Sequence, residues 1–147
     1  MFRPLLFLPI IVLASLGCSK DDDPPPVPSI ANIQGLWVGP VADSQGQGNA
    51  AVTFSQSGTT ASGTFVTNTT SGNISATVNS LTEGAFTVNR TQPSNCIGTY
   101  TGIIVINGNS MEVVYTGTDC NGPITGGYGA LTRNTSSSSI NPWGAIH

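Results

Sequence analysis

The stretch NISATVNSLTEGAFTVN, residues 73–89, decides the fold class of this chain. Apolar side chains recur there at every second position, first at Ile74, Ala76 and Val78 and then at Phe86 and Val88. Serine, threonine and asparagine occupy most of the positions between them. A period of two is typical of a β-strand that buries one face, so the stretch predicts two consecutive strands.

The same alternation extends in both directions along the chain. It predicts eight strands in all, at Ile33–Val38, Ala50–Gln56, Thr60–Asn68, Asn73–Asn79, Gly84–Asn89, Ile97–Ile106, Met111–Thr116 and Ile124–Thr132. Turn-forming residues such as Asn107-Gly108-Asn109 and Asn121-Gly122 separate them. We expect Pro40, Pro93 and Pro123 in connections or at a strand start, because proline cannot donate to a β-ladder. No sustained helical periodicity interrupts the region, which is therefore all-β.

Eight short sequential strands with tight turns favour an up-and-down antiparallel β-barrel, because closure removes unpaired edges. The alternative is a β-sandwich. Several glycines fall within the predicted strands, where they permit the sharp coiling or bulges that a small barrel needs. These are Gly63, Gly98, Gly102, Gly126, Gly127 and Gly129.

The composition excludes one class of partner. The chain of 147 residues has four Lys and Arg against seven Asp and Glu, for a formal net charge of −3. Binding to a nucleic acid requires clustered basic residues to neutralise phosphates, and no such cluster occurs. We therefore expect no nucleic-acid partner.

The first 17 residues have the features of a secretory signal peptide. Arg3 provides the positive start, and an apolar run from Leu5 to Leu13 follows, which is too short to span a membrane as a helix. The segment ends in Ser15-Leu16-Gly17-Cys18, which resembles the lipobox of bacterial lipoproteins. That resemblance implies that Cys18 is lipidated and becomes the first residue of a mature protein held by membrane lipid.

The remaining chain divides into three parts. Residues 18–32 contain Lys20-Asp21-Asp22-Asp23 and a proline-rich run, which predict an extended tether. Residues 33–133 form the barrel domain, and the serine-rich residues 134–147 are expected to be a disordered tail. Ser19 after the lipobox implies the outer membrane, whereas the acidic run resembles a surface-export signal or is simply a charged linker. We expect a lipid-anchored protein of the bacterial cell envelope.

The lipobox also resolves the odd number of cysteines. If Cys18 carries lipid, Cys96 and Cys120 remain as a pair in an oxidising compartment, and we predict a disulfide between them. The alternative is two free or metal-binding thiols. No histidine lies near them and no C-x-x-C spacing occurs, so no metal site is predicted.

Two short pieces of the barrel domain resemble lipocalins and their relatives. In that group a Gly-x-Trp on the first strand packs against an arginine near the end of the barrel. Here Gly35 and Trp37 stand on the first predicted strand, and Arg133 follows the last one. The resemblance implies that Trp37 plugs one end of the barrel while the Arg133 guanidinium stacks on its face.

Aromatic side chains are the candidates for lining a ligand pocket. Tyr100, Tyr115 and Tyr128 stand on three neighbouring predicted strands and could form one wall, while Phe54 and Phe65 could line the same interior. The competing hypothesis is that all of these side chains fill the core. An eight-stranded barrel is just wide enough to be filled in this way, which favours the competing hypothesis.

The sequence offers little for catalysis. The domain contains no lysine, and His147 is the last residue, so nucleophilic schemes lack a base. Its carboxylates are Asp43, Glu83, Glu112 and Asp119, and solubility explains them as turn or surface residues. We therefore expect no catalytic residues, no cofactor and no enzyme activity.

The sequence as a whole favours a membrane-anchored binding protein. One hypothesis is that the barrel holds a small apolar ligand. The alternative is that outer loops bind another envelope protein or inhibit a hydrolase.

Overall fold

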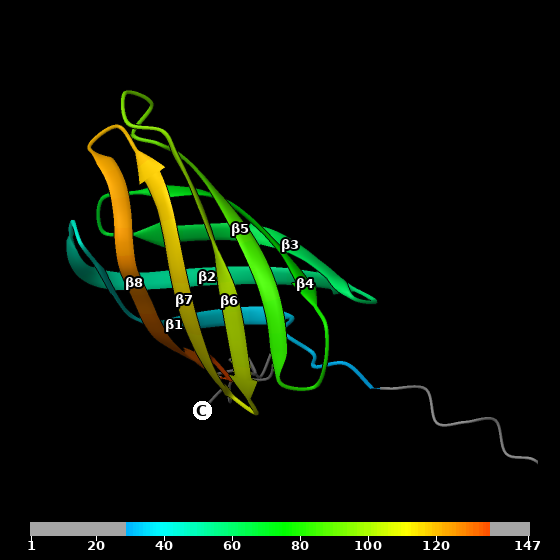
Figure 1. Cartoon of the computed structure of the whole chain (residues 1–147). Helices are drawn as coiled ribbons and strands as arrows, with labels where there is room; N and C mark the ends of the chain where they lie inside the picture. The colour runs from blue at the N-terminus through cyan, green and yellow to red at the C-terminus, as the bar shows by residue number, and fades with distance from the viewer. Residues whose placement is uncertain (1–28, 136–147) are drawn as a thin grey trace, which may run out of the picture.

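The computed structural model describes residues 29–135 and contains eight antiparallel strands and no helix. Each strand pairs with the next, and the last pairs with the first, which closes the barrel (Figure 1). The prediction of an all-β, up-and-down barrel is thereby confirmed over the sandwich alternative. The strands are β1 (Gly35–Asp43), β2 (Gly46–Ser57), β3 (Thr60–Thr67), β4 (Ser71–Val78), β5 (Glu83–Gln92), β6 (Gly98–Asn107), β7 (Ser110–Asp119) and β8 (Gly122–Arg133).

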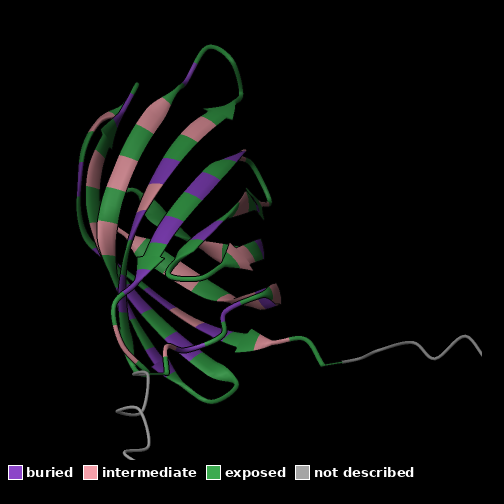
Figure 2. Cartoon of the chain, turned by 90° about the vertical axis from the view of Figure 1, so that its right-hand side faces the viewer, coloured by how far each residue is buried: buried purple, intermediate pink, exposed green. Residues whose placement is uncertain are grey.

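Burial alternates along most of the strands, as the banding in Figure 2 shows. Inward-facing residues of β2 to β8 are mostly buried and apolar, whereas the outward face of β2 to β5 is largely serine, threonine and asparagine. The outward face of β6 to β8 is more apolar, with Ile103, Val114 and Tyr128 exposed. The hydrophobic interior therefore supplies the main driving force for closure.

Trp37 closes one end of the barrel. Its side chain is fully buried, and its indole N–H donates to the Ile33 carbonyl at 2.8 Å. The Arg133 guanidinium lies 4.4 Å from the centre of the Trp37 ring and donates to the backbone carbonyls of Asn32 and Gln34. This stacking is the arrangement that the lipocalin resemblance implies. We call this region the closed end.

The segment that precedes β1 is part of the closed end. Gln56 accepts from the Ile33 N–H at 2.7 Å and donates to the Ala31 carbonyl at 2.9 Å. Ala31 is buried, and Ile30 packs against the core. Residues 30–32, which we assigned to the tether, therefore pack on the barrel. The predicted signal peptide, Cys18 and most of the predicted tether and tail lie outside the described residues.

The strands extend further than predicted, chiefly at the end opposite Trp37. Pro40, expected in a connection, lies within β1 opposite Asn49. The pairing of β1 with β8 is interrupted between Val38 and Val41, where Pro40 has no N–H to donate. Pro123 stands near the start of β8 and Pro93 in the connection after β5, as expected.

Two strand glycines allow neighbouring backbones to approach closely. A Cβ atom at Gly63 would lie 1.7 Å from the Thr53 carbonyl oxygen, and one at Gly102 would lie 2.1 Å from that of Val114. No side chain fits at either position. The glycines therefore permit the tight coiling of β3 and β6 that we expected from them.

Candidate functional site

The barrel contains a cavity of about 460 Å³, which opens at the end opposite Trp37. Its volume is within the range of pockets that hold small molecules. The four connections at the open end, residues 44–45, 68–70, 93–97 and 120–121, form what we call the rim. Side chains such as Phe54, Ile104 and Met111 pack in the core but do not fill the barrel completely, contrary to the filled core that we favoured from the sequence.

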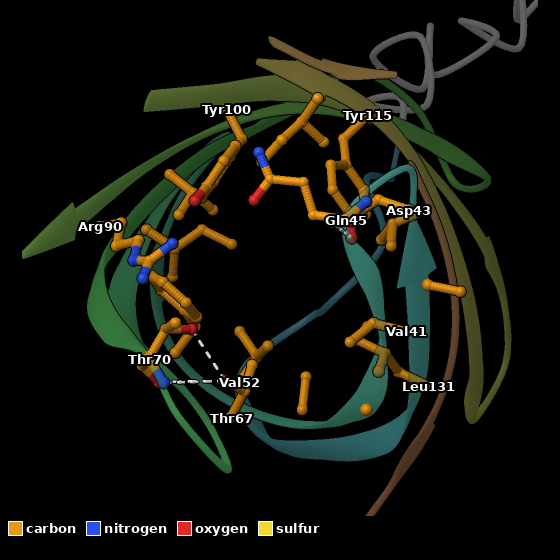
Figure 3. A pocket seen from close by; sticks show the side chains of 18 of the residues that line it. Val41, Asp43, Gln45, Val52, Thr67, Thr70, Arg90, Tyr100, Tyr115 and Leu131 are labelled. Carbon is orange, nitrogen blue, oxygen red and sulfur yellow. Dashed lines mark hydrogen bonds between the residues drawn. The ribbon is translucent and has the colours of Figure 1, made fainter. Parts of the chain in front are cut away.

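The inner part of the cavity is apolar. Its lining residues come from all eight strands and point toward the barrel axis (Figure 3). Phe54 and Phe65, named from the sequence as lining candidates, are among them. The others are Val41, Ala50, Val52, Ile74, Phe86, Val88, Ile104, Met111, Val113, Ile124 and Leu131.

Tyr100 and Tyr115, which were also named from the sequence as lining candidates, lie along the cavity near the rim. Their rings make an edge-to-face contact with centres 6.2 Å apart. The Tyr115 hydroxyl donates to Asp43 Oδ2 at 3.1 Å, which ties β7 to β1. Burial, and then the adjacent Asp43 carboxylate, raise the pKa of Tyr115 well above its usual value, so this phenol remains a hydrogen-bond donor.

Tyr128 does not line the cavity, contrary to our expectation. Its side chain is 46% exposed on the outside of β8. The reason is an irregularity in the pairing of β7 with β8, where Gly126 has φ +62°. The extra residue shifts the alternation by one, so Ile124 and then Gly127, Gly129 and Leu131 face inward. Without this bulge, Tyr128 would share the inner face with Ile124.

An ion pair joins two inner side chains near the rim. Arg90 Nη1 lies 2.6 Å from Asp119 Oδ2, and the two side chains are 10% and 0% exposed. Asp119 also accepts from Gln45 Nε2 at 3.0 Å and from the Asn121 N–H at 2.8 Å. Burial opposes ionisation of Asp119, but the hydrogen bonds from Gln45 and Asn121 and the charge of Arg90 outweigh it and lower its pKa.

The sequence analysis missed this pair. We assigned Asp119 to a polar turn, and it is instead buried on the inner wall. The signal was available in the alternation, since Phe86, Val88 and Arg90 share one face of β5. The predicted strands stopped at Asn89 and Thr116, one and three residues too early to include the pair.

The disulfide between Cys96 and Cys120 is confirmed. It joins the β5–β6 connection to the β7–β8 turn, next to Asp119, with the two Cα atoms 4.8 Å apart. The two sulfurs and an Asp119 oxygen lie within 4.8 Å of one another. Because both sulfurs are in the disulfide, neither is a thiolate that could bind a metal ion.

The rim is braced unevenly. The β1–β2 turn is held to β8 by backbone and side-chain bonds between Ser44 and Thr125, each 3.1 Å long. The β3–β4 turn instead bonds mainly to itself, with the hydroxyls of Thr67 and Thr70 2.8 Å apart. Asp43 and Gln45 therefore lie on the braced side of the opening, whereas Arg90 lies across from them, on the side of Thr70 (Figure 3).

The comparisons with known proteins agree with the fold. No protein-family model matches the chain, and no curated protein sequence does. A redesigned β-barrel, b11L5F_LGL, is similar to this chain with a TM-score of 0.55 and 16% identity over 69% of this chain and 90% of its own. A second redesigned barrel, mFAP1, bound to DFHBI, has a TM-score of 0.54 and 17% identity over 68% and 94%.

These likenesses establish the barrel fold. The eight-stranded antiparallel barrel also resembles lipocalin-like barrels in its architecture. No helix among residues 29–135 is long and apolar enough to cross a bilayer.

Proposed function

We propose that this protein binds a small, largely apolar ligand inside its barrel and does not catalyse a reaction. The observation that carries the proposal is the cavity of about 460 Å³, apolar in depth and open at one end. Burial of a ligand's apolar surface against such walls provides binding energy. The similar redesigned barrel mFAP1, bound to DFHBI, is a precedent for a ligand bound by a barrel of this kind.

We propose that lipid on Cys18 anchors the protein to the bacterial cell envelope, with the outer membrane as its location. The lipobox-like Ser15-Leu16-Gly17-Cys18 and the preceding apolar run support this. The confirmed disulfide fits export to an oxidising compartment. Mass spectrometry of the protein from its native host tests the anchor, since lipidation adds acyl mass to a chain that begins at Cys18. A chain that begins elsewhere, without acyl mass, would contradict it.

The absence of catalysis rests on the residue types around the cavity. Neither histidine nor lysine occurs among residues 29–135. The charged residues that line the cavity are Asp43, Arg90 and Asp119, and the last two neutralise each other. Binding is therefore the function that these side chains support best.

Native mass spectrometry of protein released gently from its own envelope tests the binding proposal. We expect a reproducible added mass of small-molecule size that is lost on unfolding. A stoichiometric protein partner in place of a small molecule would favour the alternative, in which the outer loops bind an envelope protein or inhibit a hydrolase.

A matched pair of variants locates the binding site. Val113 lines the cavity, whereas its neighbour Val114 is 49% exposed on the outside of the same strand. We expect V113F to reduce binding of the neutral apolar dye Nile red by about tenfold and V114F to leave it unchanged. Equal effects of the two substitutions would place the dye outside the barrel and contradict the proposal.

A further inference from the structure

Negative charges outnumber positive charges around the cavity. Among residues 29–135, the lining contains two carboxylates, Asp43 and Asp119, and one cation, Arg90. Asp119 holds Arg90 at 2.6 Å, so that pair is internally neutral. The other cation of the described chain, Arg133, is stacked on Trp37 at the closed end. One net negative charge, that of Asp43, therefore remains at the opening.

Asp43 has the capacity to bind a donor from a ligand. Its Oδ1 accepts the Gln45 N–H at 2.8 Å, and its Oδ2 accepts the Tyr115 hydroxyl at 3.1 Å. A carboxylate has about four acceptor positions, so two of them are not used by these bonds. The side chain is half-buried and lines the cavity, which makes these positions accessible from inside the barrel.

Aromatic rings lie beside this carboxylate. Tyr115, which is bonded to Asp43, and Tyr100, 6.2 Å away by ring centres, both line the cavity. Ring faces attract cations through the π-electron quadrupole, and they attract them more strongly where water is partly excluded. An anionic group at the same place would be repelled by the Asp43 carboxylate. It would gain little attraction from Arg90, because Asp119 already neutralises that charge.

From this arrangement we propose that the ligand is an amphipathic cation, with its apolar body in the barrel and a protonated amine beside Asp43, Tyr100 and Tyr115. The inference rests on the proposed function, because it names the class of ligand that the same cavity takes. The body of the ligand would lie in the apolar inner part of the cavity, and its head group would lie on the acidic side of the rim. A carboxylate amphiphile of equal length binds more weakly.

Three probes that differ only in their head groups test the proposal. Dodecylamine, dodecanol and dodecanoate are titrated at neutral pH below their solubility limits and micellar concentrations, with displacement of Nile red as the readout. We expect the amine to bind about tenfold more tightly than the alcohol, and the carboxylate to bind most weakly. D43N should lower amine affinity to that of the alcohol and leave alcohol affinity unchanged.

Two further variants separate charge from shape. E83Q removes an exposed carboxylate near the closed end and should change none of the three affinities. Y115F keeps the ring but loses the hydroxyl that bonds Asp43, so the preference for the amine should persist. Thermal melting of each variant checks that it folds.

The binding experiments distinguish a failure of this inference from a failure of the proposed function. If the alcohol or the carboxylate binds as tightly as the amine, the inference is overturned while the barrel remains a binding protein. An amine preference that D43N does not reduce would also overturn it. If neither Nile red nor any of the three probes binds, the proposed function itself is contradicted.

Discussion

Arg90 on β5 and Asp119 on β7 form their ion pair across β6, directly over Gly98. Gly98 is paired with Arg90 on one side and with Asp119 on the other. It faces inward and has no side chain, so the guanidinium can pass over it to reach the carboxylate 2.6 Å away. The ion pair therefore links β5 to β7 near the rim, and the glycine on β6 leaves room for it.

Removing the carboxylate of this pair should destabilise the barrel. In D119N the Arg90 charge stays on the inner wall without its counter-ion, and we expect a loss of about 2 kcal/mol in the free energy of unfolding. The loss is smaller than in a dry core because the cavity opens to water at this end. Urea unfolding measures it, with E112Q on the outward face of the same strand as the control. Equal stabilities of D119N and E112Q would mean that the pair contributes nothing.

The same pair predicts a dependence of stability on pH. The pKa of Asp119 is lower in the folded protein than its usual value near 3.9, so the folded state favours the ionised form. Its contribution is present above about pH 4 and is lost as pH falls through the lower folded pKa. The stability difference between the native protein and D119N should therefore shrink below about pH 4. A difference that stays constant down to acid unfolding would contradict the assignment.

A methyl group at Gly98 should disturb the ion pair without changing any charge. A Cβ atom there would lie 2.6 Å from the Asp119 Cβ and 2.8 Å from the Thr118 carbonyl oxygen. We expect G98A to cost about 1–3 kcal/mol through overpacking. Part of that cost should disappear when D119N is already present, because the substitution and the pair share one site. A double-mutant cycle measures this coupling, and strict additivity would show that Gly98 acts independently of the pair.

Replacing Arg133 should destabilise the closed end of the barrel. R133A removes the stacking on Trp37 and the donors to the Asn32 and Gln34 carbonyls, and should cost about 1–2 kcal/mol. R133K keeps the charge but not the planar fork, so it should recover only part of that stability. Fluorescence of Trp37 in a W143F background should shift to longer wavelength as the closed end loosens. An unchanged emission in R133A would mean that Trp37 is buried without help from Arg133.

Local periodicity was enough to predict most of the fold. The alternation around Ile74 and Phe86 identified one buried face per strand, and eight such strands can close without leaving edges. Oxidation of Cys96 and Cys120 followed from their number and the expected compartment. Each of these features is encoded in neighbouring residues or in a simple count.

The features that the sequence analysis did not predict depend on the register between strands. Gly126 inserts a bulge that turns Tyr128 outward, and a single positive φ is not visible in a pattern of apolar residues. Arg90 and Asp119 are 29 residues apart, and only the pairing of both strands with β6 brings them together. Whether eight strands enclose a filled or a hollow interior depends on side-chain volumes summed around the barrel. No single stretch of sequence contains that information.

If lipid on Cys18 anchors the protein as proposed, the position of the first described residues determines the end of the barrel from which the tether leaves. Residues 30–34 lie at the closed end, where the Ala31 N–H donates to the Ser80 carbonyl, and the cavity opens at the other end. A tether from Cys18 would thus join the barrel at its closed end, away from the opening. A ligand could then enter and leave through the opening without the tether standing in its path.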